Sequence, residues 1–129
     1  MTLLLDTQVA LWWLTASPRL SKASRALVSN SACAVSVASL WEVAIKHKLG
    51  KLAVSPRRFR DELQRGGAAI LFVSDEHVLA TMNLPPSHGD PFDRLLLAVA
   101  DLEQLELLTA DAALIALAER DLRLPVREA

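Results

Sequence analysis

Four acidic residues occupy positions where an α/β fold brings its functional ends together. Asp6 and Asp111 each follow a short apolar run, Glu42 lies within a predicted helix, and Asp93 lies at the start of another. In open parallel sheets, ligands bind outside the carboxyl ends of the strands. We therefore expect the four carboxylates to meet at that edge of the sheet.

Converging carboxylates repel one another unless a cation lies among them. Oxygen ligands and water form the environment that Mg²⁺ and Mn²⁺ prefer, and the sequence has no Cys/His pair at zinc spacing. Such a metal activates water, polarises a scissile phosphate and stabilises the leaving oxygen. The pattern therefore favours metal-dependent phosphodiester hydrolysis.

Three of these regions also allow a purely structural interpretation. Asp6 and Asp111 are suited to cap the helices that follow them. Around Pro91, Asp90 is a good N-cap residue and Asp93 falls at the third helical position, as in a capping box. We interpret Asp90 as mainly structural and Asp93 as mainly catalytic.

Glu42 lies on a predicted helical stripe with Ala38, Ile45 and Leu49, which are apolar. A carboxylate on an apolar face is costly unless it is paired or binds a metal. The alternative is a surface ion pair with Lys46, which is four residues further on.

The elements that must position these residues alternate between strand and helix. Strands are predicted over 2–6, 32–36, 69–73 and 107–109, with an edge strand over 124–126. Helices are predicted over 8–15, 20–29, 37–49, from 56 in a basic segment, 75–82, 91–105 and 112–121. This alternation predicts a three-layer α/β/α fold with a central, mostly parallel sheet, in a single domain over 1–129.

The composition indicates a protein that has no membrane span and exposes some apolar surface. The 129 residues are 52% hydrophobic, with a mean hydropathy of +0.28, so we expect a partner to cover some apolar surface. Candidate partner-binding residues are Trp12, Trp13 and Trp41. No apolar run approaches the ~20 residues of a membrane span. The N-terminal sequence does not resemble a signal peptide and Cys33 is the lone cysteine, so we expect a cytoplasmic protein.

Charge is divided unevenly between the two halves. Residues 1–65 hold ten Lys and Arg against four Asp and Glu, whereas residues 66–129 hold four against eleven. The basic excess is concentrated within 46–65, and a polyanion can bind such a patch, although a solvated surface is the simpler explanation of a charge run alone. The candidate RNA-binding residues are Lys46, Lys48, Lys51, Arg57, Arg58 and Arg60.

Four segments in this order resemble a PIN domain and, more narrowly, the VapC-type toxins of bacterial toxin–antitoxin pairs. They are Leu4-Leu5-Asp6-Thr7, Ser39-Leu40-Trp41-Glu42-Val43, Asp90-Pro91-Phe92-Asp93-Arg94-Leu95-Leu96 and Leu108-Thr109-Ala110-Asp111. The resemblance covers almost the whole chain and rests on the order and spacing of the segments.

The resemblance implies a Mg²⁺- or Mn²⁺-dependent endoribonuclease that is inhibited by a VapB-like antitoxin and forms a homodimer. The family's acidic positions carry over to Asp6, Glu42, Asp93 and Asp111 as catalytic and metal-binding residues. Accessory roles are implied for Thr109, Asp90 and Arg94, and a substrate contact for His88.

Two other functions fit the same fold class. A phosphoacceptor receiver domain requires an acid pair after the first strand and a lysine near the last, but Asp6 stands alone there and no lysine follows Lys51. A non-catalytic PIN-fold binding module has no need of inward-facing carboxylates. Both alternatives are therefore less favoured than the nuclease.

Overall fold

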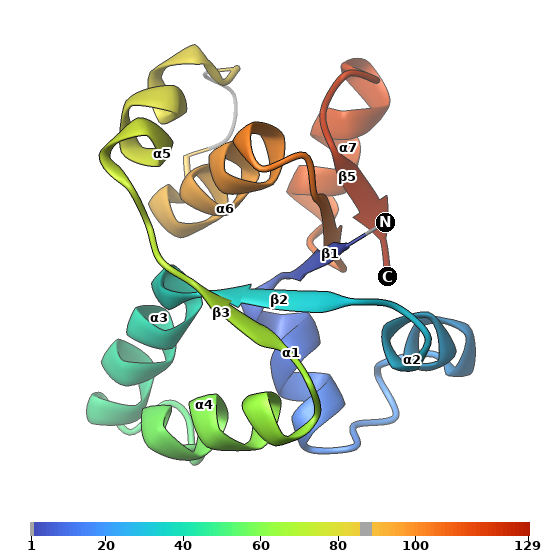
Figure 1. Ribbon diagram of the computed structural model, residues 1–129, viewed down its shortest axis with the longest axis vertical. Coiled ribbons are helices and arrows are strands. Elements are labelled where there is room, and N and C mark those ends of the chain that lie inside the picture. Colours follow the sequence, from blue (N-terminus) through green and yellow to red (C-terminus); the bar gives the residue numbers. More distant parts are fainter. Residues whose placement is uncertain (1, 86–88) are drawn as a thin grey trace.

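A fully parallel sheet forms the centre of the molecule (Figure 1). The computed structural model describes residues 2–85 and 89–129. Over these residues, the sheet has five strands in the order β3-β2-β1-β4-β5. The strands are β1 (Leu3–Leu5), β2 (Cys33–Ser36), β3 (Ala69–Leu71), β4 (Glu106–Thr109) and β5 (Val126–Glu128).

Helices cover both faces of this sheet (Figure 1). On one face lie α1 (Thr7–Leu14), α2 (Lys22–Ser29), α3 (Val37–Lys48) and α4 (Pro56–Arg65). On the other lie α5 (Asp75–Ala80), α6 (Pro91–Leu102) and α7 (Ala112–Arg120), with the 3₁₀ helix η1 (Thr81–Asn83) after α5. The predicted three-layer α/β/α fold is therefore confirmed.

The central strand β1 contributes side chains to two hydrophobic cores, one on each face of the sheet. Leu3 and Leu5 pack with the helices of one face, whereas Leu4 packs with α6 and α7 on the other. Successive side chains of a strand point to opposite faces, so a strand buried on both sides needs an unbroken apolar run. All three leucines are accordingly buried.

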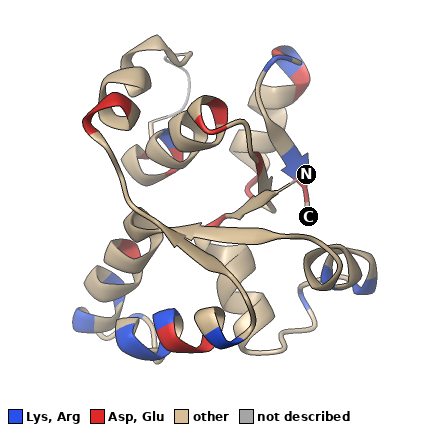
Figure 2. Cartoon of the chain, viewed as in Figure 1, with Lys and Arg blue, Asp and Glu red and all other residues tan. Residues whose placement is uncertain are grey.

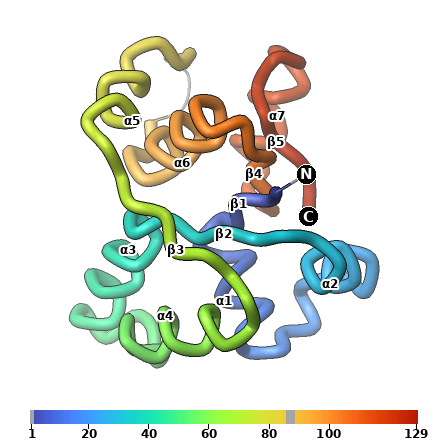
Figure 3. The backbone as a smooth tube through the Cα atoms, in the orientation of Figure 1, coloured from blue at the N-terminus to red at the C-terminus, as the bar shows by residue number. Residues whose placement is uncertain are grey.

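The strand register brings the polar ends of the strands together. β1 pairs in parallel with β4, and Leu5 lies opposite Leu108. The residues that follow them, Asp6 and Thr109, therefore lie side by side at this end of the sheet. The tube view shows α1 leaving the end of β1 beneath the sheet, while α6 and α7 lie above it (Figure 3).

Several predicted boundaries differ from the structure by a few residues, and two of the differences have clear local reasons. The helix predicted over 91–105 ends at Leu102 because Gln104 adopts a positive φ of 55°, and Leu105 N–H closes the end by donating to Ala100 O at 2.8 Å. The edge strand predicted over 124–126 is β5, which begins after Pro125, a residue without an N–H. Across the described ranges, none of the helices is long and apolar enough to cross a membrane.

Candidate active site

Asp6 lies at the end of β1 and is only 6% exposed. Its Oδ1 accepts a 2.8 Å hydrogen bond from Thr7 N–H, which caps α1, and its Oδ2 accepts a 2.7 Å hydrogen bond from Thr109 Oγ1. The predicted capping role of Asp6 is thus confirmed. A carboxylate oxygen has more than one lone pair, so both oxygens keep the capacity to bind a cation.

Thr109 joins two acidic residues from neighbouring segments. Its hydroxyl donates to Asp6 and accepts a 3.0 Å hydrogen bond from Asp111 N–H. Asp111 in turn caps α7, because its Oδ1 accepts a 3.0 Å hydrogen bond from Leu114 N–H. The buried Thr109 therefore fixes Asp6 and Asp111 relative to each other.

Glu42 reaches the same region from α3. Thr7 Oγ1 donates a 2.8 Å hydrogen bond to Glu42 Oε1 and lies 2.8 Å from Ser39 Oγ. A hydroxyl carries one proton and a carboxylate can only accept, so the Ser39 hydroxyl supplies the proton of the second bond. Thr7 and Ser39 are both buried and therefore hold one oxygen of Glu42 in place.

Lys46 binds the other oxygen of Glu42. Its Nζ lies 2.8 Å from Glu42 Oε2, and this hydrogen bond raises the pKa of the Lys46 ammonium group. The ion pair that the sequence left as an alternative is therefore formed. The expectation that Glu42 lies on an inward-facing apolar stripe is wrong, because Ile45 and Leu49 are exposed. The helix buries Ala38, Ser39 and Val43 instead.

Asp90 and Asp93 stand at the start of α6. Asp90 Oδ1 accepts hydrogen bonds from Phe92 N–H at 2.9 Å and Asp93 N–H at 3.3 Å, so it is the N-cap of the helix. Pro91 takes the first helical position, as predicted. Asp93 is 8% exposed, whereas Asp90 is exposed.

All these acids line one cleft of about 440 Å³ at the carboxyl edge of the sheet. Three helices, α1, α6 and α7, begin there with an aspartate as N-cap. Their N-terminal N–H groups favour negative charge at this edge of the sheet. The residues that line the cleft are Asp6, Thr7, Gln8, Leu11, Trp12, Arg19, Glu42, Lys46, Asp90, Asp93, Ala110, Asp111 and Ala112.

The cleft holds more negative charge than its surroundings compensate. Burial raises the pKa of Asp6 most, the hydrogen bonds from Thr109 and Thr7 oppose that rise, and the charges of Glu42 and Asp111 add to it. Since a neighbouring positive charge would oppose the rise in the pKa of Asp6, the site is electrostatically suited to a cation.

A family model for the PIN domain matches residues 3–120. The chain belongs to the PIN domain family. The family match confirms the resemblance inferred from the sequence and removes the receiver-domain alternative. No curated protein matches the chain in sequence.

Solved structures share this PIN fold at low sequence identity. VapBC2 from Rickettsia felis, bound to a DNA fragment from its promoter, has a TM-score of 0.69 at 18% identity over 99% of this chain and 98% of its own. DNA-bound VapBC from Salmonella typhimurium has a TM-score of 0.69 at 14% identity over 99% and 98%. A toxin–antitoxin complex from Klebsiella pneumoniae has a TM-score of 0.57 at 24% identity over 84% and 85%. These similarities establish the fold.

The PIN-domain cleft has donors of the kind that a hard divalent cation takes. Five carboxylates line it, two of them at the start of α6, and oxygen ligands suit Mg²⁺ and Mn²⁺. Within the described residues, however, no three His, Cys, Asp or Glu side chains lie close enough together to form a metal-binding group. The carboxylates of the cleft are therefore suitable ligands for Mg²⁺ or Mn²⁺. In this structure, the positive charge that contacts Glu42 is the ammonium group of Lys46.

Arg94 is a structural residue in this PIN domain. Its guanidinium donates to Pro85 O and to Thr81 O, each at 2.7 Å, and so ties α6 to the segment after α5. It does not line the cleft. His88, for which a substrate contact was predicted, lies outside the described residues.

The candidate RNA-binding residues lie on α3, on α4 and between them, and all but Lys46 lie outside the cleft lining (Figure 2). Arg58 pairs with Glu62 at 2.8 Å and Arg60 with Asp61 at 2.9 Å. Among the described residues, the remaining three, Lys48, Lys51 and Arg57, form no ion pair. Their charges are the ones available to a polyanion.

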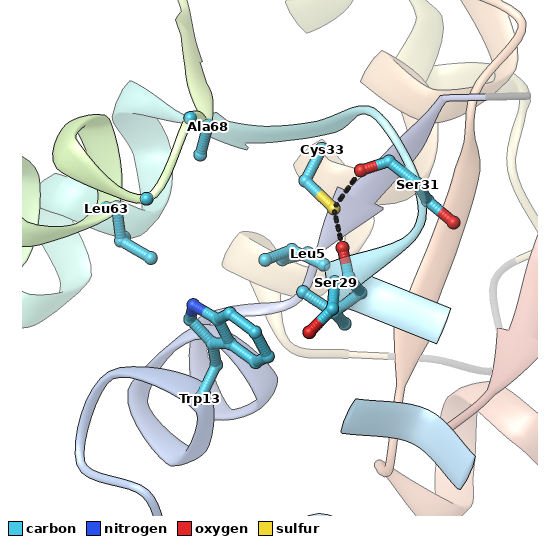
Figure 4. Close-up of a pocket in the computed structure, with 10 residues that line it drawn as sticks. Leu5, Trp13, Ser29, Ser31, Cys33, Leu63 and Ala68 are labelled. Carbon is cyan, nitrogen blue, oxygen red and sulfur yellow. Dashed lines mark hydrogen bonds between the residues drawn. The ribbon is translucent and has the colours of Figure 1, made fainter. Parts of the chain in front are cut away.

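The three tryptophans differ in exposure. Trp41 is 63% exposed and packs edge-on against Phe92 at 5.4 Å between ring centroids, whereas Trp12 and Trp13 are both partly buried against the core. Trp13 faces a separate cavity of about 250 Å³ beside Cys33, where none of the candidate acids lies (Figure 4).

Sequence reasoning missed two positioning residues, Thr7 and Ser39. Thr7 stands directly after Asp6, and Ser39 lies three residues before Glu42 and thus one helical turn away. A small hydroxyl residue beside each acid was the available signal. It becomes meaningful only when the fold places α1 against α3.

Proposed function

We propose that this PIN domain is a Mg²⁺- or Mn²⁺-dependent endoribonuclease of the VapC toxin type. The observation that carries the proposal is that Asp6, Glu42, Asp93 and Asp111, which are widely separated in sequence, line one cleft at the carboxyl edge of the sheet. A domain that used this fold only as a scaffold would gain nothing from a carboxylate whose pKa is raised by burial and by two neighbouring carboxylates.

The four acids would hold the metal. Once bound, it would supply an activated water and an electrophile for the scissile phosphate. Thr109 orients Asp6, and Thr7 orients Glu42, so these two carboxylates are held in place before substrate arrives.

RNA would be held by the unpaired basic residues beyond the cleft. Lys48, Lys51 and Arg57 place positive charge on and after α3, on the same face of the sheet as α1. Arg58 and Arg60 contribute less, because each already has an acidic partner.

An antitoxin would cover the exposed apolar side chains of α3. Trp41, Ile45 and Leu49 recur every four residues and therefore form one stripe along the helix. Such a stripe suits an amphipathic partner helix with apolar anchors. The toxin–antitoxin complexes that share the fold support an antitoxin as the partner. We also propose a homodimer.

One observation favours a second candidate, a non-catalytic PIN-fold binding module. Lys46 neutralises Glu42, and no three acidic side chains of the described residues form a metal-binding group. In that case the cleft would bind a cationic group of a partner and cleave nothing.

Cleavage of a mixed RNA pool distinguishes the two candidates. The purified chain should cleave RNA with Mn²⁺ or Mg²⁺ and not with excess chelator. Asp6→Asn and Asp93→Asn should each abolish cleavage, while Asp101→Asn should keep it, because Asp101 is an exposed acid of α6 outside the cleft. Absence of cleavage with either metal would leave the binding module as the better account.

A further inference from the structure

Lys46 is one of two basic residues, with Arg19, that line the acidic cleft, and the proposed hydrolysis gives it no role. Its Nζ lies 2.8 Å from Glu42 Oε2. The carboxylates of Asp6 and Asp90, which line the same cleft, attract the same ammonium group. Lys46 therefore lies where a metal ion would otherwise supply positive charge.

Both oxygens of Glu42 are engaged, but by partners of different mobility. Oε1 accepts from the hydroxyl of Thr7, which is 3% exposed and held on α1. Oε2 accepts from Lys46, whose side chain is 47% exposed and extends on a flexible stem. Lys46 is therefore the partner that can leave Glu42 without disturbing the core.

The arrangement of the acids agrees with a competition for Glu42. In the described residues, the carboxylates do not gather into a group of three that could hold a metal. A divalent cation bound by Glu42 would lie close to the Lys46 ammonium group on Oε2. Because the two positive charges repel each other, metal binding favours withdrawal of Lys46 from this carboxylate.

We propose that Lys46 is an internal counter-cation that competes with the divalent metal for Glu42, so that metal binding favours release of this carboxylate by Lys46. The inference rests on the metal requirement of the proposed function. Lys46 is then a positioning residue: it holds the acidic cleft together before metal binds and weakens the affinity of the cleft for metal.

Calorimetric titration of Mn²⁺ into the intact chain tests the competition directly. Lys46→Met removes the charge and keeps an apolar stem, and Lys48→Met is the matched control, since Lys48 lies on the same helix outside the cleft. Lys46→Met should bind Mn²⁺ about two- to fivefold more tightly, as expected for removal of a partly exposed ion pair. Lys48→Met should bind like the wild type. Equal or weaker binding by Lys46→Met overturns the proposal.

Two further variants show whether the effect acts through Glu42. Lys46→Arg keeps the charge and should bind Mn²⁺ with nearly wild-type affinity. In a Glu42→Gln background, Lys46→Met should give little further gain, because the ion pair is already lost. A gain of the same size in both backgrounds overturns the assignment to Glu42.

Thermal unfolding gives a readout that does not depend on activity. Without metal, Lys46→Met should melt at a lower temperature than the wild type, because the acids then repel one another without a counter-charge. Saturating Mn²⁺ should raise its melting temperature by more than that of the wild type. Equal increases for the two proteins contradict the proposal.

The outcomes separate this inference from the proposed function. If the wild type cleaves RNA with Mn²⁺ while Lys46→Met binds the metal no more tightly, the inference fails and the nuclease stands. If no variant binds Mn²⁺ and none cleaves RNA, both fail. Weaker RNA binding by Lys46→Met at unchanged Mn²⁺ affinity assigns Lys46 to a substrate phosphate and likewise overturns the inference.

Discussion

Thr109 Oγ1 donates a 2.7 Å hydrogen bond to Asp6 Oδ2, which joins the ends of two neighbouring parallel strands across 103 residues of sequence. Both side chains are buried. The bond depends on the register that places Leu5 opposite Leu108, so the fold itself prepares this corner of the cleft.

Replacing this hydroxyl should cost stability. Thr109→Val keeps the shape of the side chain but leaves Asp6 Oδ2 and Asp111 N–H without their partner. Buried groups that lose a partner cost about 1–3 kcal/mol of unfolding free energy. Urea denaturation measures the loss, and Thr109→Ser, which keeps the hydroxyl, should recover most of it. Equal stability of the Val and Ser variants would contradict the role of the hydroxyl.

Asp6 should make stability depend on pH. Burial raises its pKa above 3.8 in the folded chain, so the folded state holds this proton more tightly than the unfolded state does. The contribution of Asp6 to the unfolding free energy is therefore highest below pH 3.8, and it falls as the pH rises through the raised pKa. Asp6→Asn should remove this fall, so that its stability relative to the wild type increases with pH over that window. A constant difference between the two proteins would refute the assignment.

Asp90 and Asp93 should separate stability from activity. Asp90→Ala removes the N-cap of α6 and should cost about 1 kcal/mol of unfolding free energy, whereas Asp90→Ser should keep the cap. Asp93→Asn should reduce RNA cleavage strongly and change the unfolding free energy little. Paired chemical denaturation and cleavage assays test both, and an Asp90→Ala variant that is fully stable but inactive would reverse the two assignments.

How far the sequence anticipates the site depends on the range of each interaction. The acids at the strand ends and the caps at Asp90 and Asp111 were predictable, because helix starts and strand ends are local patterns. The hydrogen bonds of Thr7 to Glu42 and of Thr109 to Asp6 were not, because they join elements 35 and 103 residues apart. The exposure of Leu49 was also missed, since an apolar stripe looks the same whether the core or a partner covers it.

RNA binding should respond unequally to the arginines of α4. Arg57→Glu reverses a charge that has no ion pair within the described residues, whereas Arg58→Glu reverses one already offset by Glu62. Arg57→Glu should therefore weaken RNA binding more and reduce the slope of log affinity against log salt by about 0.7 for a single-stranded RNA. Filter binding over a range of salt concentrations measures both variants, and unchanged slopes would exclude this surface.

The stripe on α3 should affect binding of the antitoxin and leave folding intact. Leu49→Lys alters a side chain that is 63% exposed at the end of the helix, so the melting temperature of the free chain should stay close to wild type. Its complex with a co-expressed VapB-like antitoxin should weaken, as measured by size-exclusion chromatography with light scattering. A complex of undiminished stability would place the antitoxin elsewhere.

The central claim, that this cleft holds a catalytic divalent metal, is tested most directly by a crystal structure after a Mn²⁺ soak, with anomalous scattering used to locate the ion. We predict an Mn²⁺ ion bound by Asp6 and Asp93, with Lys46 withdrawn from Glu42. Manganese bound at another place on the chain, or an acidic cleft that stays free of metal at saturating Mn²⁺, would contradict the account.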